Sequence, residues 1–366
     1  MKRGRVLAFA ALCAVCAVGA AAYVRHAMQR SRAAPTNLPA PGADAGVGEA
    51  AIGGRGAVLL FRSTAMDSSY GKLALAPLDH ASDRRVISAL SCERVDYAAG
   101  RGVCLTAARG VLTTYSAIVF DEDFRPVFTL PLAGAPSRVR VSPDGVFAAV
   151  TVFVSGHSYA ADFSTVTSVI DLRTGEYVVP NLEQLTVWNG AERFEAADRN
   201  FWGVTFRKGG DAFYATVGSG GRTHLIEGTS SGRSAKMLRD GVECPSLSPD
   251  NTRVAFKRRV GDGVGPVRWR LSLLDLGTLQ DRPLAETRSV DDQVAWLDDG
   301  HIMYALPDAE SGSAETTTWV VDVDGGGSPR VLVPQAYSAV VWRPSRSVPA
   351  GDLTESDTSP ASRPSP

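Results

Sequence analysis

The sequence predicts an all-β protein, a six-bladed β-propeller closed by a C-terminal strand and preceded by one N-terminal transmembrane or signal helix. Three observations lead to this prediction: an apolar stretch near the N-terminus, two motifs that each recur six times, and the offset between these two series. The 366 residues, of which 44% are hydrophobic and 21% charged, are enough for a large core and exclude a disordered polymer.

The N-terminal residues 1–30 have the composition of a membrane-targeting segment. Residues 6–24 carry no charge, and Lys2, Arg3 and Arg5 precede them. A signal peptide usually has an apolar region of ~7 to 15 residues, whereas a membrane span needs ~20. The length favours an uncleaved anchor, and a small-residue cleavage site at residues 20–22 keeps a secreted product open as the alternative. In both cases we expect the body outside the cytoplasmic membrane.

Two segments flank the folded body and are poor in large apolar residues. Residues 31–55 are rich in Pro, Ala and Gly, and residues 346–366 are rich in Ser, Thr and Pro. Such compositions do not bury enough apolar surface to fold, so we interpret the first segment as a linker and the second as a disordered tail. The propeller is therefore expected within residues 56–345.

A first motif recurs through the body: a short apolar strand that ends in an acidic residue and a polar or glycine-bearing turn. The acids of the six copies are Asp79, Asp121, Asp171, Glu227, Asp275 and Asp322. They lie 42, 50, 56, 48 and 47 residues apart, which is the spacing of a four-stranded propeller blade. Because such an acid can accept backbone N–H bonds in the turn that follows it, we expect a structural role.

A second motif is a strand that runs into a Pro/Asp/Gly turn and then into another apolar strand. Its clearest copies are residues 141–150 and 247–256, and weaker copies lie at residues 95–105, 206–214 and 296–304 and at Trp342-Arg343-Pro344. Proline presets such a turn, and Asp-Gly or Asp-Asn completes it. These copies are therefore predicted to be hairpins that join two strands of one blade.

The two series are offset in a way that predicts how the ring closes. Asp79 has no copy of the second motif before it, and Trp342 has no copy of the first motif after it. The strand at residues 338–342 is therefore expected to be the innermost strand of the blade formed by residues 57–61, 72–78 and 84–88. This exchange removes the exposed sheet edge that the alternative, an open stack of β repeats, would retain.

Several phrases of the sequence resemble a known family. Val141-Ser142-Pro143-Asp144-Gly145 and Leu247-Ser248-Pro249-Asp250 are similar to the Ser-Pro-Asp-Gly hairpin of TolB-like, WD-repeat-like propellers. Gly156-His157-Ser158-Tyr159, Asn200-Phe201-Trp202-Gly203-Val204 and Asp291-Asp292-Gln293-Val294 resemble the uncharacterised bacterial branch described as TolB-like translocation proteins. The resemblance covers most of residues 56–345 and implies a six-bladed propeller that acts as a scaffold in the cell envelope.

The two faces of such a propeller are expected to differ. The stereotyped hairpins share one face with the acid-ended turns, whereas the other face receives long, dissimilar connections at residues 62–71, 155–164, 218–223, 258–268 and 307–318. Binding residues tend to lie on variable loops held by a rigid scaffold. We therefore predict the binding site on the irregular face, with tolerated insertions as the alternative interpretation.

Eight residues on the irregular face are candidates for binding. Most are polar residues just before the inner strands, where they would surround the mouth of the central channel, and two aromatic residues and a histidine add contacts: Glu93, His157, Tyr159, Trp202, Glu243, Asp291, Asp292 and Gln293. The acids predict a port for a basic peptide segment or for Ca²⁺, which prefers oxygen ligands. Alternatively, they accept backbone N–H bonds between blades.

The sequence argues against several other functions. The 38 basic and 39 acidic residues nearly cancel, and the basic excess lies in the first 32 residues, so the body lacks the charge that nucleic acid binding requires. His157 and His224 lie in neighbouring blades but lack the third ligand of a typical metal site. No Gly-x-Ser-x-Gly motif marks a nucleophile, although a pair of carboxylates as in glycosidases stays open. We therefore expect no cofactor, with Ca²⁺ at the channel mouth as the one candidate.

The body contains three cysteines, Cys92, Cys104 and Cys244. Cys92 and Cys104 flank a predicted hairpin. A register that pairs Asp96 with Cys104 would leave Cys92 roughly 13 Å away along the strand, whereas a disulfide needs Cα atoms within ~7 Å. Buried free thiols are therefore the expectation, and a disulfide would require Cys92 to leave the strand ladder.

These observations favour a non-catalytic interaction scaffold over an enzyme. We expect an extracytoplasmic propeller, held at the cytoplasmic membrane by its single N-terminal helix, that binds an envelope protein or peptide at the irregular face and channel mouth. The alternatives are a sensor for a small molecule or glycan and, third, a hydrolase or lyase on the channel face.

Overall fold

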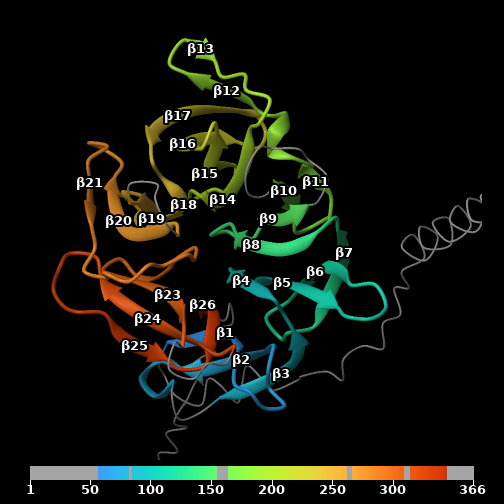
Figure 1. Cartoon of the computed structure of the whole chain (residues 1–366). Coiled ribbons are helices and arrows are strands. Elements are labelled where there is room, and N and C mark those ends of the chain that lie inside the picture. The colour runs from blue at the N-terminus through green and yellow to red at the C-terminus, as the bar shows by residue number, and fades with distance from the viewer. Residues whose placement is uncertain (1–56, 82–84, 155–163, 262–265, 309–313, 344–366) are drawn as a thin grey trace, which may run out of the picture.

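The computed structural model of the chain describes residues 57–81, 85–154, 164–261, 266–308 and 314–343. Six antiparallel sheets surround a central axis, each with its innermost strand next to that axis (Figure 1). This arrangement confirms the predicted all-β, six-bladed propeller.

The first three blades each contain four strands. Blade 1 consists of β26 (Ala336–Trp342), β1 (Val58–Ser63), β2 (Lys72–Pro77) and β3 (Val86–Ser91), with the short 3-10 helix η1 (Leu78–His80) after β2. Blade 2 consists of β4 (Arg94–Ala98), β5 (Arg101–Ala108), β6 (Thr114–Phe120) and β7 (Pro126–Leu132). Blade 3 consists of β8 (Ala135–Val141), β9 (Phe147–Val154), β10 (Ser164–Asp171) and β11 (Tyr177–Val179).

Blade 4 is larger than the other blades. It consists of β14 (Asn200–Phe206), β15 (Ala212–Ser219), β16 (Arg222–Thr229) and β17 (Ser234–Asp240), extended by β12 (Thr186–Asn189) and β13 (Glu192–Arg193). Blade 5 consists of β18 (Glu243–Leu247), β19 (Arg253–Val260), β20 (Arg268–Asp275) and β21 (Asp281–Pro283). Blade 6 consists of β22 (Ala295–Asp298), β23 (His301–Pro307), β24 (Thr316–Asp322) and β25 (Arg330–Val333).

The C-terminal strand closes the ring, as the offset of the two motifs predicts. β26 pairs antiparallel with β1, so that Val58 lies opposite Trp342 and Leu59 opposite Val341. Blade 1 therefore combines one strand from the end of the body with three from its beginning. Both ends of the described chain leave the propeller at the same face.

The hydrophobic core is divided among the contacts between neighbouring blades. Each of six buried clusters draws its side chains mainly from two adjacent blades. Between blades 1 and 2, for example, Trp342 packs against Tyr97 and Phe124, with ring centroids 6.4 and 6.0 Å apart. Loss of one blade would therefore expose two clusters.

Most of the acid-ended turns have the predicted structural role. Asp121, Asp171, Asp275 and Asp322 each accept at least one backbone N–H bond from the turn that follows. Glu227 differs, because its carboxylate instead pairs with the side chains of Arg207 and Lys236.

The extension of blade 4 is a feature that the sequence motifs did not reveal. The 3-10 helix η2 (Leu182–Gln184) follows blade 3, and β12 then pairs parallel with β17 at the outer edge of blade 4. Leu182 and Val187 are fully buried in the cluster between blades 3 and 4. This segment accounts for the longest spacing between motif acids, the 56 residues from Asp171 to Glu227.

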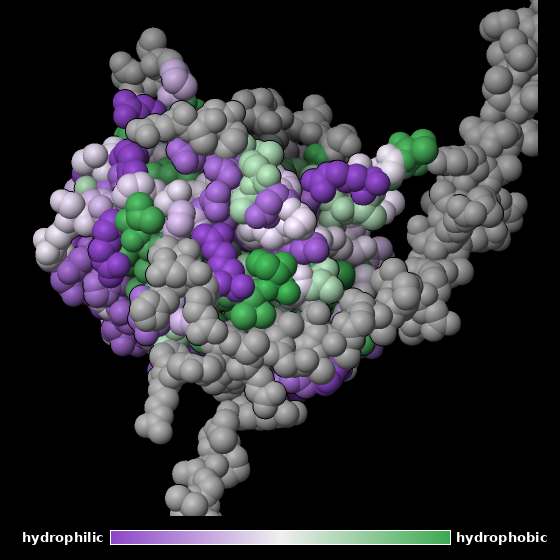
Figure 2. All heavy atoms as spheres, turned by 90° about the horizontal axis from the view of Figure 1, so that it is seen from below, coloured by the Kyte–Doolittle hydropathy of each residue, from purple (hydrophilic) through white to green (hydrophobic). Residues whose placement is uncertain are grey.

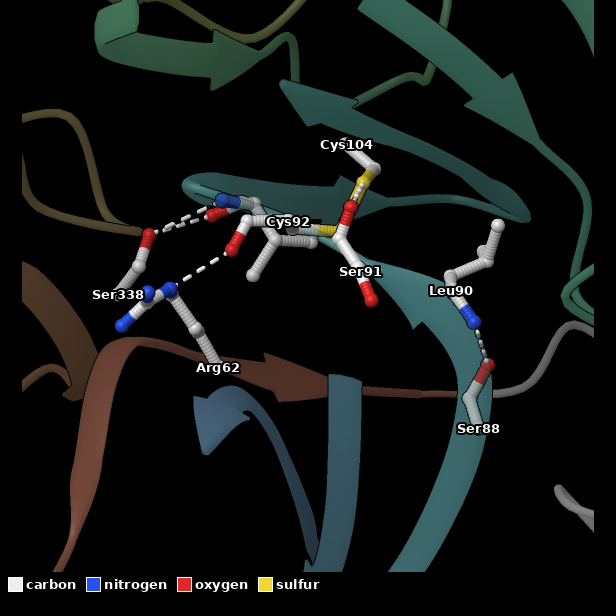
Figure 3. The surroundings of a disulfide bond; sticks show 8 residues. Arg62, Ser88, Leu90, Ser91, Cys92, Cys104 and Ser338 are labelled. Carbon is white, nitrogen blue, oxygen red and sulfur yellow. Dashed lines mark hydrogen bonds between the residues drawn. A yellow bond between two sulfur atoms is a disulfide. The ribbon is translucent and has the colours of Figure 1, made fainter. Parts of the chain in front are cut away.

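The expectation of free thiols at Cys92 and Cys104 is wrong, because these residues form a disulfide (Figure 3). Val95, rather than Asp96, lies opposite Cys104. Cys92 precedes β4 and leaves the ladder, since its N–H donates to the carbonyl oxygen of Gly71 in blade 1. The cysteine Cα atoms are consequently 5.3 Å apart. Cys244 stays a buried free thiol, as expected.

The predicted N-terminal anchor and linker lie outside the described residues, as does the C-terminal tail. Within the described ranges, the structure contains no helix with the length and apolar character of a membrane span.

The role of β26 predicts that the chain needs this strand to fold. Truncation after residue 335 removes the partner of β1 together with Trp342, whose loss from a core alone typically costs ~3 to 5 kcal/mol. We expect aggregation or a greatly lowered melting temperature for this variant in thermal unfolding. Truncation after residue 345 is the control and should melt as the full chain does. Equal melting of the two variants would contradict the closure.

The disulfide predicts a second measurable effect. Replacement of Cys92 and Cys104 by Ser should lower the free energy of unfolding by ~2 to 5 kcal/mol in urea titrations, because the unfolded chain is no longer constrained. Reduction should destabilise the wild type by a similar amount but leave the double variant unchanged. Alkylation of Cys92 or Cys104 in denatured but unreduced protein would show that the bond does not form.

Candidate functional site

The two faces of the propeller can be defined by the direction of the inner strands. All six inner strands start at one face, which also receives the connections β1–β2, β5–β6, β9–β10, β15–β16, β19–β20 and β23–β24. We call this the loop face and the opposite one, which carries the Ser-Pro-Asp hairpins, the turn face. Residues 155–163, 262–265 and 309–313, which belong to the connections β9–β10, β19–β20 and β23–β24, are outside the described residues.

A groove of about 430 Å³ opens on the loop face where blades 3, 4 and 5 meet. We call it the loop-face groove. Its apolar lining comes mainly from Phe153, Trp202 and Trp269, and its charged lining consists of Arg138, Asp198, Arg222, Glu243, Lys257, Arg259 and Asp291. Three of the predicted binding residues, Trp202, Glu243 and Asp291, thus lie together in this groove.

A lysine links the two predicted acids of the groove. Lys257 on β19 is almost fully buried, and its ammonium forms ion pairs with Asp291 and, at 3.7 Å, with Glu243. Its Nζ also lies 4.4 Å from the centre of the Trp269 ring, a cation–π distance. Lys257 therefore offsets part of the negative charge of the two acids, which modifies the simple acidic port expected from the sequence.

The environment of Glu243 perturbs its ionisation. Burial raises the pKa of the Glu243 carboxyl, while the positive charge of Lys257 lowers it in part. Asp291 differs in exposure, because about half of its side chain is accessible, 54% against 11% for Glu243. Asp291 is consequently the acid of the pair that a ligand can reach from solvent.

The floor of the groove depends on a close approach between β14 and β18. Gly203 and Cys244 both have positive φ, of 65° and 49°, at bulges in these neighbouring inner strands. A Cβ atom on Gly203 would lie 2.6 Å from the Cα atom of Cys244, so glycine is required there. The bulges place Trp202 beside Gly218, where a Cβ atom would likewise contact its ring at 2.6 Å.

Asp292 and Gln293 face the central channel and bond to other blades. Asp292 pairs with Arg94 of blade 2 at 2.9 Å and accepts the N–H of Ala305. Gln293 donates from Nε2 to the carbonyl oxygens of Val204 and Pro245, at 3.1 and 3.3 Å. These two residues do connect blades, but through the Arg94 side chain and through donation by Gln293 to carbonyl oxygens; the backbone N–H that Asp292 accepts belongs to its own blade.

Of the three remaining predicted residues, the structure describes only Glu93, which does not line the groove. Glu93 lies between blades 1 and 2, where it pairs with Arg109 at 2.6 Å and Arg62 at 3.8 Å. His157 and Tyr159 fall outside the described residues. His224, the proposed neighbour of His157, bonds through Nδ1 to Asp240 at 2.7 Å.

The sequence analysis missed the basic residues of the site. Arg138 and Lys257 line the groove, and Arg94 and Arg140 line the channel beneath it. A signal was present, because Arg138 and Arg140 are two residues apart in the strand before Ser142-Pro143, and such residues share one face of a strand. In the described part of the chain, no three His, Cys, Asp or Glu side chains are grouped to hold a metal ion. Ca²⁺ at the channel mouth stays a prediction.

Comparison with solved structures agrees with the fold. TolB from Acinetobacter baumannii is similar with a TM-score of 0.53 at 17% identity, over 78% of this chain and 66% of TolB. The expected resemblance to TolB-like propellers is thereby confirmed as a likeness of fold. A puromycin-hydrolysing peptidase from Mycobacterium tuberculosis matches more weakly, with a TM-score of 0.44 at 14% identity over 76% of this chain and 45% of the peptidase. The sequence matches no family model and no curated protein.

The buried ion pairs predict how stability depends on pH. Lys257→Met should cost ~3 to 5 kcal/mol in urea titrations at neutral pH, because it removes the closest counter-ion of Glu243 and Asp291. Without Lys257 the pKa of Glu243 rises further in the folded protein. A carboxyl whose pKa is higher in the folded than in the unfolded state lowers the stability of the protein as the pH increases above the pKa in the unfolded chain, ~4.3 for Glu. The loss should therefore be larger at pH 8 than at pH 5.

A double variant provides the control for this effect. Adding Glu243→Gln to Lys257→Met removes one unpaired charge and should restore part of the stability at pH 8 but little at pH 5. A destabilisation of Lys257→Met that is equal at both pH values would argue against the ion pairs.

Proposed function

We propose that this protein is a non-catalytic interaction scaffold of the cell envelope that binds a segment of a partner protein in the loop-face groove. The observation that carries the proposal is the groove itself, in which aromatic rings and ion-paired charges combine. Aromatic anchors surrounded by polar groups are typical of protein binding sites.

The distribution of exposed apolar side chains supports the loop face as the binding surface. Among the described residues, seven of the twelve exposed large hydrophobic residues lie in or next to loop-face connections: Met66, Tyr70, Val111, Leu112, Phe153, Val260 and Val267. The other five lie on outer strands of five different blades: Ile87, Val127, Tyr177, Trp188 and Val331. Exposed apolar residues that concentrate on one face are typical of interaction sites. On the side of the molecule drawn in Figure 2, by contrast, the coloured hydrophobic residues form small groups between hydrophilic ones.

One feature supports an extracytoplasmic location: the Cys92–Cys104 disulfide is of a kind that persists in oxidising compartments. Because β1 begins at the turn face, beside the end of β26, a membrane anchor within residues 1–30 would connect to that face through the predicted linker.

The described residues of the groove do not favour catalysis. Its lining includes no histidine in the described part of the chain, and its one cysteine, Cys244, is buried. The carboxylates Glu243 and Asp291 both pair with Lys257, so the two acids share a counter-ion instead of facing each other across an open space as an acid and base pair.

A small-molecule or glycan sensor is the second candidate. A volume of about 430 Å³ lies within the ~300 to 1,000 Å³ that is common for small-ligand pockets, and two tryptophans line it. Isothermal titration calorimetry with sugars separates the two functions. Saturable binding of a sugar that Trp269→Ala abolishes would favour the sensor.

Site-specific photocrosslinking tests the proposed binding face. A photoreactive amino acid at Phe153 or Val111 on the loop face should form adducts with one discrete partner in cells, because both positions are exposed. The same probe at Lys208 or Glu176 on the turn face is the matched control and should form none. Adducts confined to the turn face would refute the proposal.

Substitution of Asp291 provides a complementary test. Asp291→Asn should weaken capture of the crosslinked partner and reduce its salt sensitivity, because the exposed carboxylate supplies electrostatic steering. Asp275→Asn on the turn face should leave capture unchanged. Glu243 and Asp292 are buried, so substitutions there would confound binding with stability.

A further inference from the structure

Two arginines in the central channel lack a closely bonded counter-ion. Arg138 and Arg140 lie on β8, two residues apart, and both line a small cavity on the channel axis. Their side chains are largely buried, with exposed fractions of 14% and 16%. The acid nearest to each guanidinium is 3.9 Å away, Asp291 for Arg138 and Asp96 for Arg140. This distance is too long for a hydrogen bond.

Both of these acids have closer partners elsewhere. Asp291 pairs with Lys257, and Asp96 accepts the backbone N–H of Val141 at 2.7 Å. The third channel arginine, Arg94, differs because it forms a direct 2.9 Å ion pair with Asp292. Among the described residues, Arg138 and Arg140 are therefore the channel arginines without a hydrogen-bonded acid.

The N–H groups of these two arginine side chains are only partly hydrogen-bonded. Arg138 donates from one terminal nitrogen to the carbonyl oxygen of Ser137, and Arg140 donates similarly to that of Val294, both at 2.9 Å. Among the described residues, the buried Nε atoms of both side chains have no hydrogen-bond partner. Three arginines, Arg94, Arg138 and Arg140, and two aspartates, Asp96 and Asp292, line the cavity, so arginines outnumber acids by one. Because buried donors without acceptors are costly, an acceptor with one negative charge would be stabilised beside Arg138 and Arg140.

The cavity sets the size of such an acceptor. Its volume is about 30 Å³, room for roughly two water molecules by the usual measure, and hence for one chloride ion or one carboxylate group. Arg138 also lines the loop-face groove, so the cavity and the groove adjoin at this residue. An anion can therefore come from solution or from the end of a segment bound in the groove.

We propose that Arg138 and Arg140 form a binding site for one small monovalent anion, of chloride or carboxylate size, at the inner end of the loop-face groove. Its occupant is either a free ion or a terminal carboxylate of the groove ligand. The second source rests on the proposed function, whereas the first does not.

Thermal unfolding of the full-length protein in different sodium salts tests the site. At equal ionic strength, chloride and formate should raise the melting temperature by about 2 °C relative to gluconate, which is too large for the cavity. Arg138→Gln and Arg140→Gln should each abolish this difference. Arg222→Gln, which changes an arginine that lines only the groove, should retain it.

A measurement on the wild type avoids dependence on variants that fold poorly. The ³⁵Cl NMR line of chloride should broaden in the presence of the protein, and formate should reverse the broadening by competition. Equal melting in all three salts together with an unbroadened chloride line would overturn the proposal.

A second arm distinguishes the sources of the anion. A mixture of random hexapeptides with free C-termini is compared with the same mixture after C-terminal amidation. Preferential retention of the free form, lost in Arg140→Gln, would assign the site to a ligand terminus. If the salt effect on the melting temperature is present, equal retention of both peptide forms would assign the site to free ions. Retention of neither form would also assign the site to free ions, and it would count against the proposed binding of a partner segment without affecting the anion site.

Discussion

The pairing of β26 with β1 is the constraint on which the rest of the structure depends. Every buried cluster lies between two blades, so each blade needs a neighbour on both sides, and blades 1 and 6 become neighbours only through this pairing. Trp342 then completes the cluster between blades 1 and 2. Closure also fixes the direction of all inner strands, which places their starting ends, and with them the groove, on one face.

Because the ring is closed, buried polar side chains can form hydrogen bonds between neighbouring blades. Thr165 bonds to Asn200 and Phe201, Thr205 accepts from Leu247, and Ser338 bonds to both backbone groups of Val95, in each case across a contact between blades. Such buried polar groups are costly unless they are bonded. Polar residues near the axis thus largely hold blades together, and Arg140 takes part through its hydrogen bond to the carbonyl oxygen of Val294. Arg138 and Arg140 differ from Arg94 in that the nearest acid among the described residues is 3.9 Å from each guanidinium.

The sequence was sufficient to predict the architecture but only part of the site. The blade number and the closing strand follow from motif spacing along the chain, and each blade is local in sequence. The partners of Glu243, Asp291 and Asp292 come from other strands and, for Asp292, from another blade, and motif spacing does not reveal such contacts. The Cys92–Cys104 bond was not predicted because it depends on two local details. The register of β4 and β5 differs by one residue from the expected one, and the chain bends before β4; ideal strand geometry shows neither.

A nearly symmetric ring gains a specific site only where its repeats differ, and the groove lies at such a place. The inner strands β14 and β18 bulge side by side, with Gly203 against Cys244, and the N–H of Cys244 is held by the hydroxyl of Thr216. Bulges redirect side chains and are common beside functional sites. The buried Lys257, which a ring built only for stability could replace with an apolar residue, fixes Glu243 and Asp291 in the same region. The groove therefore lies where two bulged inner strands, a buried lysine and two acids come together on the loop face.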